Sequence, residues 1–221
     1  MATNNTIIFV NNTEMQEHKD IYYKNKLNVC QSVKMHFSVP PYHLLKRIIQ
    51  SLVPPIFNKH QKIYVDLLGP LLAVLSLTVL LHYGHAAKLP TAASKMSPTE
   101  VLLVYMTLMP VVSYILVRLG QSRITLVEII SILGYALFGH ILTLTVSMIF
   151  YNEESNTFFF LCLMMFGGLS TLRIVLILVA LIPKPAVRLI VCSFVSVVQL
   201  LLLVFLHFLY MHRTFKYAKN N

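Results

Sequence analysis

The sequence predicts an all-α membrane protein: a bundle of five transmembrane helices with an amphipathic juxtamembrane helix on the cytosolic side. Hydrophobic residues make up 57% of the 221 residues, with a mean hydropathy of +0.70, whereas the apolar share of a soluble domain is about 45–50%. Two neighbouring apolar runs, residues 124–150 and 158–182, are each long enough to cross a hydrocarbon core of about 30 Å at about 1.5 Å per residue, and three further apolar runs complete the five spans. The composition therefore excludes a soluble domain.

The chain before the first span divides into two segments. Residues 1–41 are rich in Asn, Lys, Gln and Ser, and this composition predicts a flexible cytosolic segment. Residues 42–65 form an amphipathic juxtamembrane segment. Its apolar residues recur at helical spacing and oppose a polar face: Leu45, Ile48, Ile49, Leu52 and Val53 against His43, Lys46, Arg47 and Gln50. Such a helix lies on the membrane surface, docks on the cytosolic end of the bundle or binds a partner, and the sequence leaves all three open.

The membrane domain is expected to cover residues 66–210. The predicted spans are about residues 67–83, 99–119, 124–150, 158–182 and 187–210. Asp66 stands where it can cap the first span, and Pro70 falls in its first turn, where a missing amide proton costs little. The short turn at 120–123 makes the second and third spans antiparallel neighbours. Residues 211–221 are left as a short tail.

Orientation follows from the Lys and Arg residues, which number 18. With the N terminus in the cytosol, twelve of them fall in cytosolic segments and five in lumenal segments, and Arg173 is intramembrane. Basic residues favour the cytosolic side. We therefore expect a cytosolic N terminus and, after five spans, a lumenal C terminus.

The third and fourth spans interrupt their apolar runs with glycine, hydroxyl and ionisable residues, which lipid does not favour. A helical wheel gives the third span an expected lipid face of Ile130, Leu133, Leu137, Ile141, Leu144 and Met148. The opposite, protein-facing side holds Glu128, Tyr135, Ala136, Gly139, His140, Thr143 and Ser147. The fourth span carries Gly167, Gly168, Ser170 and Thr171, small residues that let backbones approach closely. We expect a packed hairpin at the centre of the bundle, whose small and polar faces serve helix packing or a partner interface.

Arg173 is the costliest residue of the membrane domain, because a charge deep in a helix costs about 2.5–3.5 kcal/mol without a partner or water. Glu128, Tyr135, Ser131 and backbone carbonyls are its candidate partners. A structural clamp, a ligand or lipid-headgroup site, and transport chemistry all remain open for it. A small-solute or ion transporter using Arg173, His140 and Glu128 is the alternative function class, although five spans admit no even inverted repeat.

An enzyme is not expected. Ser170 with His140 and His207 on other helices is the residue set of an intramembrane serine protease, but no oxyanion-hole donor can be named. The three cysteines lie far apart, without the spacing of a disulfide framework or a metal site. No cofactor is expected, and no basic stretch interleaved with aromatic residues indicates nucleic acid.

Four short segments resemble a known family. They are "DLLGPL" (residues 66–71), "ILGYALFGH" (132–140), "GGLSTLR" (167–173) and "LHFLY" (206–210). In this order they resemble the Yip-domain (YPT/Rab-interacting protein) family of Golgi membrane proteins, nearest to its branch numbered three. The family-motif positions include Asp66, Gly69, Pro70 and Gly134.

The resemblance implies a function through binding. Yip-domain proteins associate with Rab-type small GTPases and form hetero-complexes with a second Yip-family protein, in Golgi organisation and ER–Golgi vesicle traffic. The resemblance therefore implies an early or cis Golgi membrane location, agrees with the orientation above, and implies no catalytic residue.

Overall fold

The computed structural model describes residues 7–9, 41–52, 62–86, 96–150 and 156–211. Five helical segments in it are long and apolar enough to cross a membrane, which confirms the all-α class and the five spans. They are α4 (Leu68–Ala86), α5 (Pro98–Leu119), α6 (Leu126–Ile149), the fourth span α7–η2–α8, and the fifth span α9–η3. The fourth comprises α7 (Thr157–Cys162), the π-helical turn η2 (Leu163–Gly167) and α8 (Gly168–Leu181). The fifth comprises α9 (Pro185–Leu206) and the π-helical turn η3 (His207–Met211). All ten ends lie within three residues of the predicted ones.

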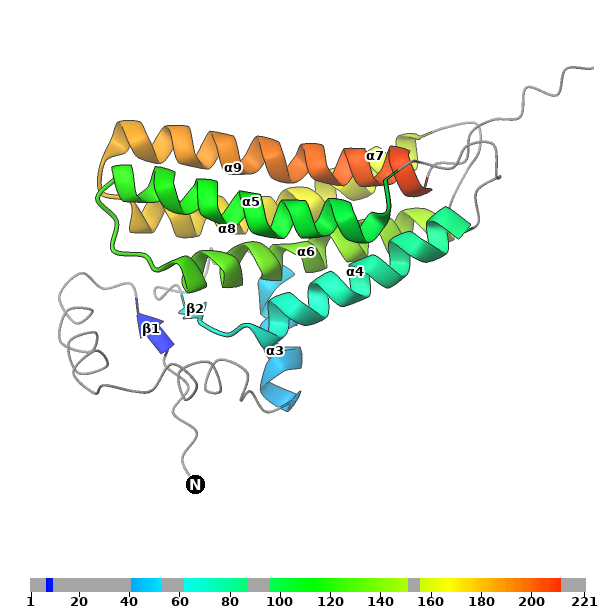
Figure 1. Cartoon of the computed structure of the whole chain (residues 1–221), viewed down its shortest axis with the longest axis horizontal. Helices are drawn as coiled ribbons and strands as arrows, with labels where there is room; N and C mark the ends of the chain where they lie inside the picture. The colour runs from blue at the N-terminus through cyan, green and yellow to red at the C-terminus, as the bar shows by residue number, and fades with distance from the viewer. Residues whose placement is uncertain (1–6, 10–40, 53–61, 87–95, 151–155, 212–221) are drawn as a thin grey trace, which may run out of the picture.

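Capping boxes start α5 and α6. Ser97 caps α5 together with Glu100, and Thr125 caps α6 together with Glu128. The Thr125 amide donates to Glu128 Oε2 at 2.7 Å, and the Glu128 amide donates to Thr125 Oγ1 at 3.4 Å. Each box satisfies two amide protons that the helix itself leaves unbonded. Between the two helices the chain turns within a few residues, so α5 and α6 are antiparallel neighbours, as predicted (Figure 1).

Helix α6 is the central element of the bundle. It contacts α3, α4, α5 and the fourth span, and its packing against α4 is the most extensive between any two elements. In its most apolar stretch 67% of the residues are buried, compared with 33–44% in the other four spans. Leu133, Leu137 and Leu144 are fully buried, so the expected lipid face was wrong for them. An apolar side chain suits a protein core as well as lipid, and here the neighbouring helices cover both sides of α6.

The segment before the first span docks on the bundle. Helix α3 (Pro41–Leu52) packs against α6 and α8 (Figure 1). Strand β1 (Ile7–Phe9) pairs antiparallel with β2 (Lys62–Tyr64), with Ile8 opposite Ile63. This short ribbon differs from the flexible segment expected over residues 1–41, because β-branched and aromatic residues favour strand pairing. The rest of that expectation lies outside the described residues.

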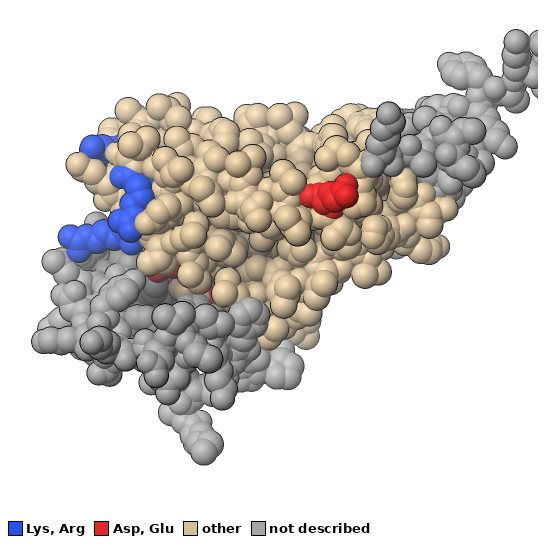
Figure 2. Space-filling view, viewed as in Figure 1, with Lys and Arg blue, Asp and Glu red and all other residues tan. Residues whose placement is uncertain are grey.

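Positive charge gathers at one end of the bundle, here called the basic end (Figure 2). It holds Arg118 at the end of α5, Arg123 before α6, and Lys184 and Arg188 at the start of α9. Gly120 contacts Ile182 and Val187, so the two loops that carry these residues touch. Glu100 lies in the first turn of α5, at the end of that helix opposite Arg118. The basic residues assigned to lumenal segments lie outside the described part of the chain.

Candidate functional site

A buried polar cluster joins α3, α4 and α6, and it is called the Asp66 cluster below. Arg47 Nη1 donates to Asp66 Oδ2 at 2.6 Å, and the two side chains are 8% and 1% exposed. The Tyr135 hydroxyl donates to the same carboxylate, at 2.8 Å from Oδ2 and 3.1 Å from Oδ1. The Gly69 amide donates to Asp66 Oδ1 at 3.0 Å. One carboxylate therefore binds a side chain from each of α3 and α6 while it caps α4.

Two glycines allow α4 and α6 to approach closely enough for this cluster. A Cβ atom at Gly69 would overlap the Tyr135 ring, and one at Gly134 would overlap Pro70. Pro70 lies within the first turn of α4, where its ring packs on α6 without loss of a helical hydrogen bond. The family-motif residues Asp66, Gly69, Pro70 and Gly134 thus form one α4–α6 junction.

The junction lies at the start of α4 but well inside α6. Tyr135 is roughly nine residues into α6, which corresponds to about 13 Å along the helix axis. A buried ion pair is stable only if its remaining hydrogen-bonding groups are also satisfied. The Tyr135 hydroxyl and the Gly69 amide provide that satisfaction for the carboxylate.

Sequence reasoning placed Asp66 as a helix cap, and the structure contains that hydrogen bond. It missed Arg47, which was assigned to the water-facing side of the amphipathic helix. In the structure Arg47 is 7% exposed and points into the bundle. The available signal was Asp66 itself, because a carboxylate buried beside an apolar helix requires a cation.

The middle of α6 forms a second cluster with α8 and α9. His140 Nε2 is 3.1 Å from the Gln199 carbonyl oxygen, and its Nδ1 is 3.3 Å from that of Ala136. Ser170 Oγ donates to the Ala136 carbonyl at 3.0 Å. A Cβ atom at Gly139 would lie 2.5 Å from Ser170 Cβ. Gly139 and Ser170 thus form the contact of the predicted hairpin, and His140 lies against a backbone carbonyl of α9.

The other small residues of the fourth span differ in their surroundings. A Cβ atom at Gly167 would lie 2.8 Å from Leu203 Cδ2 in α9, so Gly167 serves internal packing. Thr171 is also buried. Gly168 is half-buried, and a Cβ atom there would meet nothing closer than the Leu163 carbonyl oxygen at 3.8 Å. Of the chain's seven glycines, Gly168 is the one at which an added Cβ atom would make only an ordinary van der Waals contact.

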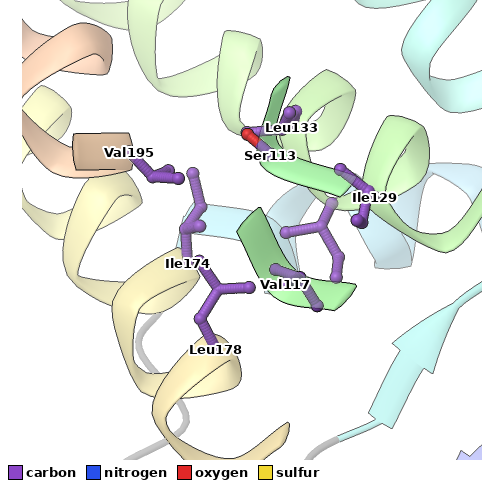
Figure 3. Close-up of a pocket in the computed structure, with 8 residues that line it drawn as sticks. Ser113, Val117, Ile129, Leu133, Ile174, Leu178 and Val195 are labelled. Atoms are coloured by element: carbon purple, nitrogen blue, oxygen red, sulfur yellow. The ribbon is translucent and has the colours of Figure 1, made fainter. Parts of the chain in front are cut away.

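The residues of the transporter hypothesis do not line the small pocket shown in Figure 3. Arg173 is half-buried in α8, roughly eight residues or about 12 Å from the end of that helix. Glu128 closes the capping box of α6. A small pocket between α5, α6, α8 and α9 is lined by Ser113 and by seven aliphatic side chains, including Val117, Ile174 and Val195 (Figure 3). Its volume of about 10 Å³ is the room of one water molecule at most.

The fold and these clusters define a class of protein: a five-span α-helical membrane protein in which Asp66, His140 and Ser170 link neighbouring helices. Residues 41–211 match the family described as the YIPF3 C-terminal domain. The chain therefore belongs to the Yip family, in its YIPF3 branch, as the motifs predicted. It matches no solved structure.

Proposed function

We propose that this protein is a non-catalytic Golgi membrane protein that supports Golgi organisation and ER–Golgi vesicle traffic by binding. Its partners are a second Yip-family membrane protein and a Rab-type small GTPase. Family membership supports the proposal. The observation that carries it is the use of the intramembrane polar groups, since Asp66, Tyr135, His140 and Ser170 contact groups of this same chain.

The same observation weighs against a transporter. Glu128 accepts a capping hydrogen bond, and both ring nitrogens of His140 lie within 3.3 Å of backbone carbonyl oxygens. The pocket in Figure 3 has an aliphatic lining that includes neither Arg173 nor His140. A binding function needs no ion path through these groups, so it agrees better with their arrangement.

The partner face in the membrane is proposed to centre on Gly168. Gly139, Gly167, Ser170 and Thr171 are covered by this chain's own helices, so they are not available to a partner. Beside Gly168 an exposed stripe runs along the fourth span: Leu161 at 54%, Met164 at 72% and Leu172 at 41% exposure. These residues recur at helical spacing around a glycine that leaves room for another backbone. In lipid, such close van der Waals packing drives helix association.

Isolation of the tagged protein from Golgi membranes in mild detergent, followed by mass spectrometry, tests the proposal. We expect a second Yip-family protein and a Rab-type GTPase to co-purify. Gly168→Leu should abolish recovery of the Yip-family partner while the chain stays folded. Ala180→Leu is the matched control, because Ala180 is exposed on the same helix but about 120° around it.

Two results would overturn parts of this proposal. If Gly168→Leu recovered the Yip-family partner at the wild-type level, the partner would not bind the face around Gly168. Recovery of the wild-type protein as a monomer, without Golgi enrichment, would refute the binding function. Solute flux through liposomes that contain the purified protein would then favour the transporter.

A further inference from the structure

Helix α3 has three distinct faces. The inner face packs on the bundle and carries Leu44, Arg47 and Ser51, which are 9%, 7% and 2% exposed. The remaining surface of the helix is exposed, but its chemistry is not uniform. One part is apolar and the other is polar.

The apolar outer face consists of Tyr42, Leu45 and Ile49, which are 77%, 61% and 57% exposed. The polar outer face consists of His43, Lys46 and Gln50, all exposed. At about 100° per residue, the centre of the apolar face is about 160° around the helix from that of the inner face, and the polar face lies about 100° from each of them. The division into inner, apolar and polar faces therefore runs along the length of α3.

We infer that α3 lies along the line where bundle, lipid and water meet, with Tyr42, Leu45 and Ile49 inserted into the interfacial layer of the bilayer. These residues lie beside membrane-spanning helices, because α3 packs directly on the spans α6 and α8. Three large apolar side chains exposed within eight positions suit lipid rather than water. Lys46 and His43 on the adjacent face then lie at headgroup level, where anionic lipids attract a cation.

The Asp66 cluster fixes α3 in this position. Arg47 extends from its inner face to Asp66, which is 19 residues away in sequence and caps the first membrane span. The ion pair therefore holds an amphipathic helix beside a transmembrane one at a defined rotation. That rotation determines which outer face meets lipid.

Fluorescence quenching in lipid nanodiscs tests this inference on the full chain. A parent with Cys30→Ser keeps Cys162 and Cys192, which are buried and report the background labelling. Single cysteines at Leu45, Ile49, His43 and Gln50 then receive an environment-sensitive fluorophore. The nanodiscs contain phosphatidylcholine and phosphatidylserine, with or without a nitroxide near the top of the acyl chain.

We expect the probes at Leu45→Cys and Ile49→Cys to show blue-shifted emission, to lose intensity with the nitroxide lipid, and to resist aqueous iodide. The probes at His43→Cys and Gln50→Cys should lose intensity with iodide. Iodide quenching at Leu45→Cys as strong as at His43→Cys would overturn the inference, because it places the apolar face in water. Resistance to both quenchers would overturn it as well, because protein then covers the face. Leu45 and Ile49 are independent positions, so one poorly folded variant leaves the other as the test.

Discussion

The Arg47–Asp66 ion pair gives the sharpest test of how the bundle is held together. Asp66→Ala removes the carboxylate that Arg47, Tyr135 and the Gly69 amide share. Arg47 then remains buried without its counter-ion, and the first turn of α4 loses its cap. Arg47→Met leaves the opposite charge, a buried carboxylate, without its cation.

The magnitudes follow from burial. Removing one partner of a buried pair costs about 3–5 kcal/mol, because the other charge stays uncompensated. Replacing both partners by apolar groups is often close to neutral, since no charge is left buried. The double variant should then lose the helix cap, which is worth about 1 kcal/mol, and the hydrogen bond from the Tyr135 hydroxyl. Asp66→Ala loses both of these and also leaves Arg47 uncompensated, so we expect Arg47→Met/Asp66→Ala to be more stable than Asp66→Ala.

Unfolding in detergent micelles, followed by circular dichroism, measures these differences; the chain has no Trp to serve as a fluorescent reporter. Lys46→Met is the matched control, because Lys46 is the exposed neighbour of Arg47 on α3 and should change stability little. Strictly additive losses in the double variant would refute the argument that the two charges compensate each other. Single variants as stable as the Lys46→Met control would refute the burial of the pair.

Three further predictions concern Gly139, Gln199 and Tyr135. Gly139→Leu should lower the free energy of unfolding by about 1–3 kcal/mol or more, because Ser170 of α8 occupies the space that the new side chain would need. Leu137→Ile should lower it by less than about 1.5 kcal/mol. Equal losses in micelle unfolding would contradict this prediction. Gln199→Leu should raise the unfolding midpoint, because the buried Gln199 carboxamide has no hydrogen-bond partner among the described residues. Each buried polar group without a hydrogen bond costs about 1–3 kcal/mol. A lower midpoint would indicate that the carboxamide binds a partner. Tyr135→Phe should cost about 1.5–3 kcal/mol through loss of the hydrogen bond to Asp66; in a thermal melt, an unchanged midpoint would argue against that bond.

The sequence predicts the spans well because the requirement that lipid imposes on a span depends only on the residues of that span. Every backbone polar group in the hydrocarbon core must be bonded within its helix, so length and apolar composition decide where a span lies. The helical wheel of α6 was less successful for Leu133, Leu137 and Leu144. A leucine is equally suited to lipid and to a core, so its neighbours, which the wheel does not contain, decide which of the two it meets.

The site shows the same division between local and distant information. Asp66 could be assigned as a cap because its hydrogen bond to the Gly69 amide is local. Arg47 could not be assigned, because its burial depends on how α3 docks on α6 and α8. His140 was expected on a protein-facing side, but its neighbour, the Gln199 carbonyl, is 59 residues away and leaves no pattern in the sequence.

We expect the basic end of the bundle, together with α3 and the Asp66 cluster, to face the cytosol. Protease protection of sealed Golgi-derived vesicles, with a tag at each end of the chain, tests this orientation directly. Five spans and the distribution of Lys and Arg predict that the tag before Met1 is digested and the tag after Asn221 is protected. Protection of the first tag would reverse the orientation, and digestion or protection of both tags would contradict an odd number of spans.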